Sequence, residues 1–86
     1  MANSQIPNLG PIFGEVLRRY RSSMNVSQEE IAFRAGVDRT FVSRIERGIR
    51  QPTITTLVGL GLALGVSAAE LVREVEAEYR KQDVSV

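Results

Sequence analysis

The sequence predicts an all-α domain of five helices, organised around a helix, a tight turn and a second helix over residues 28–48. Three observations support this. Apolar residues recur at helical spacing. Ser27 and Ser67 each precede a glutamate by three positions, which is the capping box that opens a helix. Glycines follow the apolar stretches, where a helix can end in a left-handed residue. A chain of 86 residues is enough for one small domain.

The composition excludes several classes of function. The chain has no cysteine and no histidine, so it lacks disulfides, thiolate chemistry, the commonest general base and the commonest metal ligand. It also lacks a phosphate-binding glycine loop and a carboxylate pair in a plausible cleft. We therefore expect no enzyme, no cofactor and no metal. No apolar run is long enough to span a membrane and residues 1–11 carry no signal-peptide pattern, so we expect a cytoplasmic protein.

The net charge of +1 conceals an uneven distribution. Residues 1–50 contain eight arginines and five acids, a balance of +3, whereas residues 51–86 contain three basic and five acidic residues, a balance of −2. The basic half coincides with the central pair of helices. A localised positive surface is what contact with phosphates requires.

Residues 1–10 have no periodicity and are predicted to form a flexible arm, and the absence of Arg and Lys argues against a minor-groove role for it. The first helix should begin near Gly10-Pro11. Its apolar face comprises Phe13, Val16, Leu17, Tyr20 and Met24. Arg18 and Arg19 lie off this face and are most simply solvated. The domain itself is expected to span residues 11–81.

The central motif begins with Ser27 as the cap of the second helix, whose inward face is Ile31, Ala32 and Ala35. Gly36 can adopt positive φ and turn the chain. Asp38 is a good N-cap for the third helix. Val42 and Ile45 face inward there, and Gly48 ends the helix.

The outward face of the third helix has the chemistry for reading DNA. An α-helix fits the major groove, arginine can bond guanine O6 and N7, and threonine can bond a base or contact a thymine methyl. We expect base reading by Arg39, Thr40, Ser43 and Arg44. The alternative for each is a solvated surface residue, and Ser43 could simply allow close approach. Phe41 is interpreted as core packing, with a contact to the DNA edge as the minority alternative.

A second group of residues is suited to the phosphate backbone, contacts that position a protein on DNA without reading sequence. Arg47, Arg50 and Gln51 follow at the end of the third helix and in the next loop. Ser27 and Gln28 lie at the start of the second helix, where free N–H groups and the helix dipole favour phosphate. The alternative for Gln28 is an ordinary polar residue of the first turn.

The last two helices are predicted to supply a dimer contact. Thr53 caps a helix over residues 54–64 that carries no charge and is apolar almost all round, so it must be buried on more than one side. Ser67 and Glu70 open the fifth helix, in which glutamates 74, 76 and 78 face water. Residues 82–86 should be a frayed tail. The expected interface residues are Val58, Leu62, Val75 and Tyr79, with Tyr79 alternatively folding back on its own domain.

Residues 12–73 resemble the phage-repressor and Cro-like (XRE) helix-turn-helix family. The matching segments are Ser27 to Ala32, Ala35-Gly36-Val37, Val42 to Gly48, Pro52, Leu57, Leu64 to Ser67 and Glu70-Leu71. Within this family the sequence is most similar to the restriction–modification controller proteins, whose recognition helix begins with Asp-Arg-Thr and an aromatic residue, here Asp38-Arg39-Thr40-Phe41. The resemblance implies a compact five-helix lambda-repressor-like DNA-binding domain, a structural ion pair between Arg21 and Glu46, and Gln28 on the DNA backbone.

One residue departs from the family pattern. Phe33 replaces a residue that is usually polar, and three placements remain open for it: against the N-terminal segment, against the DNA backbone, or exposed. The resemblance implies a bacterial or phage regulator associated with the nucleoid. Its partners would be operator DNA and a second copy of the chain, with RNA polymerase as a candidate further partner. No small-molecule ligand is expected.

The function expected from these features is sequence-specific transcription regulation by a homodimer on a two-fold symmetric operator. With no sensing domain, activity would follow protein concentration and dimerisation. Free-standing phage repressors and antitoxin-type regulators remain alternatives to a controller protein. A different class is a bridging or antitoxin-type protein-interaction module that keeps the fold. Such a module would not need the arginines of the third helix on one exposed face.

Overall fold

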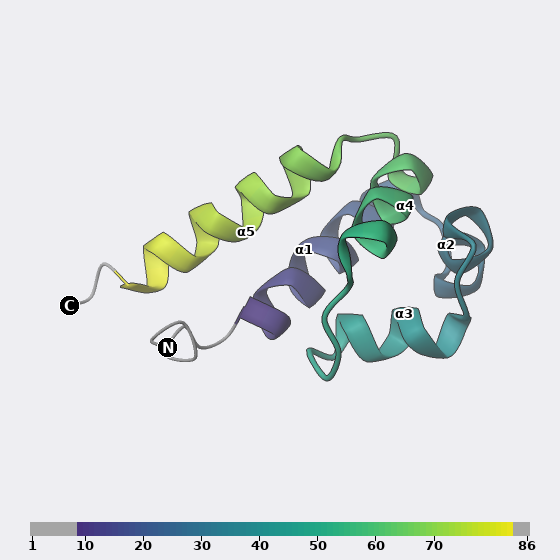
Figure 1. The fold of residues 1–86 in the computed structure, drawn as a ribbon, viewed down its shortest axis with the longest axis horizontal. Helices are drawn as coiled ribbons and strands as arrows, with labels where there is room; N and C mark the ends of the chain where they lie inside the picture. Colours follow the sequence, from purple (N-terminus) through teal and green to yellow (C-terminus); the bar gives the residue numbers. More distant parts are fainter. Residues whose placement is uncertain (1–8, 84–86) are drawn as a thin grey trace.

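The computed structural model describes residues 9–83 and contains helices without strands over that range. The elements are α1 (Leu9–Met24), α2 (Gln28–Ala35), α3 (Arg39–Glu46), α4 (Ile54–Leu64) and α5 (Ala68–Asp83) (Figure 1). The predicted all-α, five-helix fold is confirmed.

Local capping explains where the helices begin and end. The Oγ atoms of Ser27 and Ser67 accept hydrogen bonds from the backbone N–H groups of Glu30 and Glu70, both at 3.0 Å. Thr53 accepts from the N–H of Thr56 at 3.2 Å. Each bond satisfies an N–H group that the first turn leaves without a partner. Asp38 occupies the N-cap of α3, but its side chain makes no capping bond.

Left-handed residues end the helices. Asn25 has φ 59° after α1, Gly36 has φ 72° after α2, and Gly65 has φ 76° after α4. Glycine adopts this conformation without steric cost, and asparagine tolerates it. The Gly36 turn is what directs the chain from α2 into α3.

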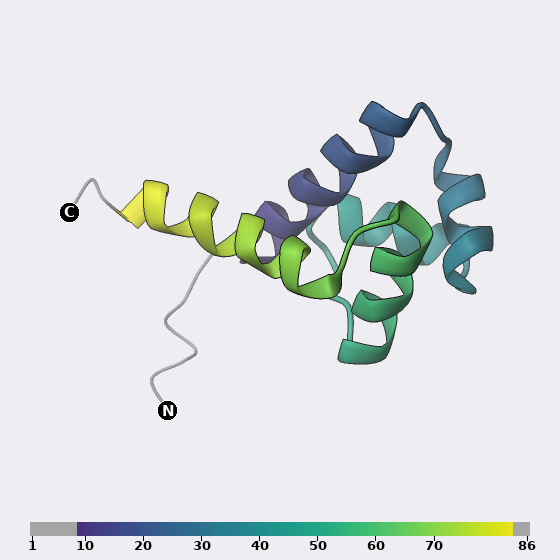
Figure 2. The same cartoon turned by 90° about the horizontal axis from the view of Figure 1, so that it is seen from above.

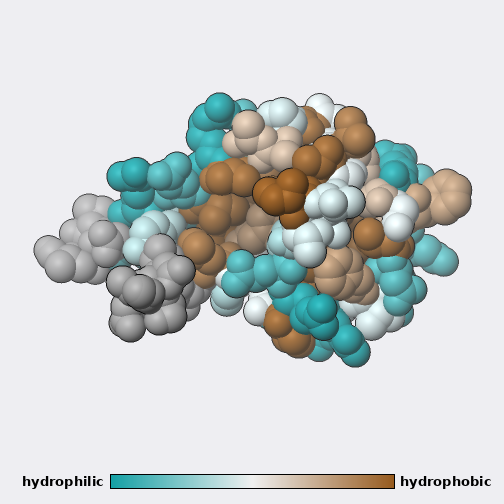
Figure 3. All heavy atoms as spheres, viewed as in Figure 1, coloured by the Kyte–Doolittle hydropathy of each residue, from teal (hydrophilic) through white to brown (hydrophobic). Residues whose placement is uncertain are grey.

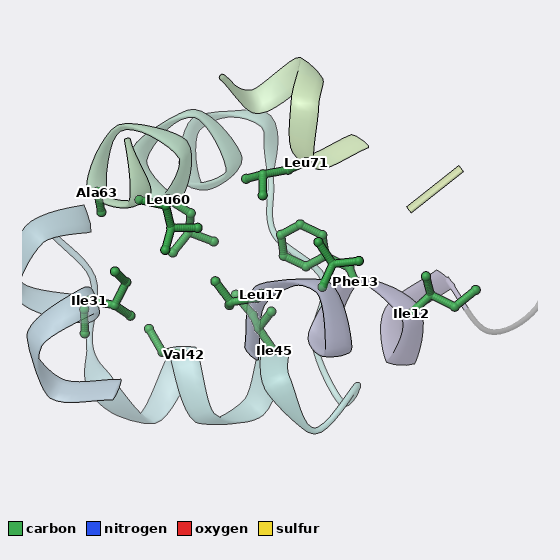
Figure 4. Packing of buried hydrophobic residues seen from close by; sticks show 12 residues of the cluster. Ile12, Phe13, Leu17, Ile31, Val42, Ile45, Leu60, Ala63 and Leu71 are labelled. Atoms are coloured by element: carbon green, nitrogen blue, oxygen red, sulfur yellow. The ribbon is translucent and has the colours of Figure 1, made fainter. Parts of the chain in front are cut away.

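The five helices share one core, to which each contributes (Figure 4). Helix α1 packs against α3 and α5, and α2 packs against α3 and α4. Figure 2 shows α5 running beside α1 and projecting beyond the other helices. The core side chains with no exposed surface are Val16, Leu17, Ile31, Val42, Ile45, Leu60 and Leu71.

Helices α1 and α3 approach each other closely at Gly14. A Cβ atom built on Gly14 would lie 2.5 Å from the Ile45 carbonyl oxygen and 2.6 Å from the Glu46 carbonyl oxygen. Both obstacles are backbone atoms, so no side-chain rotation could relieve the clash. Glycine at this position therefore lets α1 lie directly on the end of α3.

The structure corrects the expected boundaries and one core residue. Helix α1 begins at Leu9, so Leu9 and Gly10 are not part of an arm, and residues 1–8 of the predicted arm lie outside the described residues. Helix α5 reaches Asp83, which leaves only residues 84–86 of the predicted tail outside them. Met24 is 37% exposed and does not continue the core face of α1.

Within the protomer only one side of α4 is buried, and the second side, for which burial against a second subunit is predicted, is open. Ile54, Val58 and Leu62 follow one another at intervals of four and are exposed, Leu62 by 78%. Figure 3 shows hydrophobic residues at the surface where α4 and α5 lie. Val75 and Tyr79 of α5 are instead partly buried against the core.

Among the described residues, no single helix has the length and hydropathy needed to cross a membrane, and α4 and α5 meet that test only as a pair bent by 102°.

Candidate nucleic-acid interface

Helix α3 has a buried side and a side open to solvent. Val42 and Ile45 are fully buried, and Glu46 is only 4% exposed. On the other side Arg39, Thr40 and Arg44 are exposed, and Ser43 is half-buried between them. Residues three or four apart in an α-helix lie on one face. The four predicted base-reading residues therefore form one surface, which we call the α3 outer face.

The end of α3 continues this surface into the loop that follows. Gly48 has φ 78°, its N–H donates to the Ile45 carbonyl at 3.0 Å, and the Ile49 N–H donates to the Arg44 carbonyl at 2.9 Å. These two bonds are a Schellman motif, which ends the helix at Gly48 as predicted. Arg47, Arg50 and Gln51, the predicted backbone contacts, are all exposed on this loop side.

Arg50 is held by an aromatic ring. Its guanidinium lies 5.9 Å from the centroid of the half-buried Phe41 ring. A cation over a ring face is attracted to the quadrupole of the ring. Phe41 also packs against the core, so it links the loop arginine to the body of the domain.

The inner end of α3 is held by a carboxylate. Arg21 of α1 donates from Nε to Glu46 Oε2 at 2.7 Å and from Nη2 to Glu46 Oε1 at 3.0 Å. Its Nη1 donates to the Val26 carbonyl at 3.0 Å. The hydrogen bonds to Glu46 raise the pKa of Arg21 further above its ordinary value, against the smaller opposing effect of burial. The structure thus brings together the two residues expected to form an ion pair.

Arg18 also contacts the end of α3, contrary to the expectation of a solvated side chain. Its Nη2 donates to the Glu46 backbone carbonyl at 2.9 Å, and its Nη1 donates to Glu15 Oε1 at 2.7 Å. A cation suits the C-terminal end of a helix, where carbonyl groups lack partners. Arg18 lies three residues before Arg21 and therefore on the same face of α1. This spacing is the signal in the sequence that could have predicted the contact of Arg18 with α3.

Arg19 was likewise expected to be solvated, but it connects α1 to α5. It lies 3.5 Å from a carboxylate oxygen of Glu74 and 3.6 Å from one of Glu78. Both glutamates are half-buried, so the expectation that they simply face water is wrong. They project toward α1 because α5 runs beside it.

Gln28 joins the buried pair to the α3 outer face. Its Nε2 donates to Glu46 Oε1 at 3.0 Å, and its Oε1 accepts from Arg39 Nη1 at 3.5 Å. Ser27 beside it is exposed and uses its Oγ as an acceptor in the cap of α2. The Ser27 hydroxyl hydrogen can still be donated to a phosphate.

The distribution of ion pairs distinguishes the α3 outer face and the loop from the rest of the surface. Seven of the eleven basic side chains lie within 4.0 Å of a carboxylate, namely Arg18, Arg19, Arg21, Arg34, Arg73, Arg80 and Lys81. The other four have no such partner within residues 9–83, and they are Arg39, Arg44, Arg47 and Arg50. All four lie within residues 39–50, on α3 or in the loop that follows it. Their charge is available to an anion from outside the domain.

Comparison with known proteins agrees with this geometry. The helix-turn-helix family model matches residues 17–71. The HTH-type transcriptional regulator y4dJ of Sinorhizobium fredii is 43% identical over 61 residues, which are 71% of this chain and 79% of that protein. Control protein C.BamHI of Bacillus amyloliquefaciens is 38% identical over 66 residues, covering 76% of this chain and 82% of that protein.

A solved structure extends the comparison to a complex with DNA. The restriction–modification controller protein C.Esp1396I, crystallised as a tetramer with its natural 35 base-pair operator, superposes with a TM-score of 0.74. It is 30% identical, and the match covers 83% of this chain and 93% of that one.

Proposed function

This chain belongs to the helix-turn-helix (XRE-type) family of DNA-binding transcriptional regulators, and on that premise we propose that it acts as a homodimer on a two-fold symmetric operator. The similarity to C.BamHI and C.Esp1396I supports a restriction–modification controller protein as the specific role. An enzymatic role is not proposed, since the relatives are transcription regulators.

One observation carries the proposal. The four arginines without a carboxylate partner in the described part of the chain all lie on α3 and the loop after it. Elsewhere on the surface, arginines are neutralised by glutamates three or four residues away or on a neighbouring helix. A positive surface kept free of counter-charges is suited to phosphates, whose neutralisation releases condensed counterions and drives binding.

Within this surface the residues divide by position. Arg39 and Thr40 in the first turn of α3, with Ser43 and Arg44 one turn later, are proposed to read base edges in the major groove. Arg47, Arg50 and Gln51 beyond them, and Ser27 and Gln28 at the start of α2, are proposed to contact the backbone. The helical domain, predicted over residues 11–81 and extending over residues 9–83 in the structure, would thus both bind DNA and dimerise.

The exposed apolar residues of α4 support dimerisation. Val58 and Leu62 are uncovered in the protomer, and Val75 and Tyr79 of α5 are only partly buried. Apolar surface of this kind on a protomer usually marks a site where a partner binds and covers it. Two subunits would present their α3 helices about 34 Å apart, in successive major grooves on one face of the duplex. Action in the cytoplasm on nucleoid DNA, and contact with RNA polymerase, belong to the same proposal.

A mobility-shift titration on random-sequence DNA across a salt series tests the proposal. Each phosphate neutralised contributes about 0.9 to the slope of log affinity against log salt. Two backbone arginines per subunit predict a slope of roughly −4 for the dimer. A flat or absent response would reject DNA binding and favour a protein-interaction module that keeps the fold.

A further inference from the structure

We propose that Arg18 is a positioning residue for DNA binding, because it holds the end of α3 at the point where the arginine-bearing loop begins. This loop comprises residues 47–53 and carries Arg47 and Arg50. The inference rests on the proposed function, in which these two arginines contact phosphates. It starts from the hydrogen bond of 2.9 Å that Arg18 Nη2 donates to the backbone carbonyl of Glu46, the last residue of α3.

The Glu46 carbonyl is one of the four that the end of a helix leaves without partners inside the helix. The other three accept backbone N–H groups of the loop over 2.9–3.1 Å, in the pairs Arg47 to Ser43, Gly48 to Ile45 and Ile49 to Arg44. The N–H of Arg50, which would donate to Glu46 if the helix continued, turns back to Arg44 at 3.3 Å. The Glu46 carbonyl thus receives its donor from a different helix, and Arg18 completes the end of α3.

The backbone of the arginine-bearing loop lies against the same face of α1. Gly10, Gly14 and Arg18 are spaced by four residues and therefore share that face. A Cβ atom built on Gly10 would lie 3.1 Å from the Gly48 carbonyl oxygen, and one built on Gly14 would lie 2.6 Å from the Glu46 carbonyl oxygen. Helix α1 therefore supports the inner side of the loop, while the two loop arginines are exposed to solvent.

The charge of Arg18 is already matched within the domain. Its Nη1 donates to Glu15 Oε1 at 2.7 Å, and its Nε lies 3.9 Å from Glu46 Oε1. Arg47 and Arg50 have no carboxylate partner among residues 9–83. A guanidinium that faces two carboxylates gains less from a phosphate than one that faces none. The effect of Arg18 on DNA binding should therefore pass through the loop.

A loop that is held in the free protein favours binding. Ordering a backbone segment and its long side chains costs conformational entropy, and a segment that is ordered before DNA arrives avoids this cost on binding. Without Arg18, the turn after α3 would be held from α1 by packing alone. The complex should then contain the same phosphate contacts, formed with a lower affinity.

The test is a pair of double-mutant cycles on the selected operator. In the wild-type background, Arg18→Ala should weaken binding about fivefold. In a loop variant that carries Arg47→Ala and Arg50→Ala, the same substitution should weaken binding less than about twofold, because the side chains that it positions are gone. In the Arg39→Ala background the full effect should remain. Equal effects in all three backgrounds would overturn the proposal.

The salt dependence separates positioning from a direct contact. If Arg18 positions the loop, Arg18→Ala lowers the affinity and leaves the slope of log affinity against log salt unchanged, since the loop arginines still neutralise their phosphates. A slope lowered by about 1 per subunit would assign Arg18 a phosphate contact of its own and reject the positioning role. Arg19→Ala is the matched control, because it removes the neighbouring arginine, which pairs with α5. It should leave both quantities close to those of the wild type.

Amide hydrogen exchange tests the inference without DNA. The Ile49 N–H donates to the Arg44 carbonyl at 2.9 Å, and the Val42 N–H donates to the Asp38 carbonyl at 3.2 Å, at opposite ends of α3. Arg18→Ala should speed exchange at Ile49 by at least about threefold relative to Val42. An unchanged ratio would overturn the proposal. Arg18→Met, which keeps the apolar stem without the guanidinium, gives the same readouts if the alanine variant folds poorly.

The failure of this inference differs from the failure of the proposed function. Wild-type protein that shows no salt-dependent DNA binding would reject the function itself, whatever the exchange rates. Wild-type protein that binds a selected operator, combined with equal effects in the three backgrounds or an unchanged exchange ratio, would reject only the positioning role of Arg18.

Discussion

Arg21 and Glu46 are joined by two hydrogen bonds, of 2.7 and 3.0 Å, where α1 crosses the end of α3. The Glu46 side chain is 2% exposed and the Arg21 side chain 17%. The pair fixes the end of α3 on the domain from the inside, while the arginines on the outside of the same helix have no carboxylate partner within the described chain. Folding and the proposed DNA contact thus use opposite sides of one short helix.

Arg21→Ala should reduce the free energy of unfolding by about 3 kcal/mol, because it leaves a buried carboxylate without its main partner. Urea denaturation followed by circular dichroism measures this change. Arg34→Ala is the matched control, because Arg34 pairs with Glu30 on the exposed side of α2. It should cost no more than about 0.5 kcal/mol. Equal costs for the two variants would show that the Arg21–Glu46 pair behaves as a surface pair.

Arg39→Ala should weaken binding to the selected operator by about 1–3 kcal/mol and relax the preference at one base pair per half-site. The reason is that a guanidinium in the major groove can make two hydrogen bonds to guanine that other bases do not offer. Titrations on the operator and on single-base variants of it measure both effects. Unchanged preference at every position would remove Arg39 from the base-reading group.

Arg50→Ala should weaken binding to all sequences by a similar factor and lower the salt slope by about 1 per subunit. Arg50 lies over Phe41 at the end of α3, a position suited to the phosphate backbone. The measurement is the salt series on operator and random DNA. If Arg50→Ala and Arg39→Ala have the same pattern of effects, the division into reading and positioning arginines is wrong.

Leu62→Glu should convert the protein to monomers, because a charge in an apolar contact is costly to desolvate. Leu62 is 78% exposed, so the substitution should leave the fold of the protomer intact. Sedimentation velocity measures the oligomeric state. Phe33→Glu is the control, since Phe33 of α2 is 82% exposed and lies outside the proposed interface. A dimeric Leu62→Glu protein would place the interface elsewhere.

The sequence predicts the framework well because helix ends depend on local chemistry. Ser27, Thr53 and Ser67 cap helices as expected, and Gly36, Gly48 and Gly65 adopt positive φ at the ends of helices. In each case the signal and the structure involve residues only a few positions apart. The outward direction of Arg39 and Arg44 on α3 follows from the same helical spacing.

Contacts between distant elements were harder to predict. Arg18 reaches a backbone carbonyl on α3, and Arg19 pairs with two glutamates on α5. Helical periodicity places Arg18 on the same face of α1 as Arg21, but the partners of Arg18 and Arg19 depend on how α1 lies across its neighbours. The position of Gln28 at the start of α2 predicts only a contact with the DNA backbone. Its contacts with Glu46 and Arg39 become visible only once α2 and α3 are packed together.

The central claim is that the arginines of α3 and its loop, which have no carboxylate partner among residues 9–83, form the DNA-binding surface. It is tested most directly by comparing operator affinity for two fourfold variants of equal net charge. One replaces Arg39, Arg44, Arg47 and Arg50 with alanine, and the other replaces the paired, exposed residues Arg34, Arg73, Arg80 and Lys81. The first variant should lose salt-dependent binding, and the second should bind within a few-fold of the wild type. Similar losses in both would show that overall charge, and not this surface, determines binding.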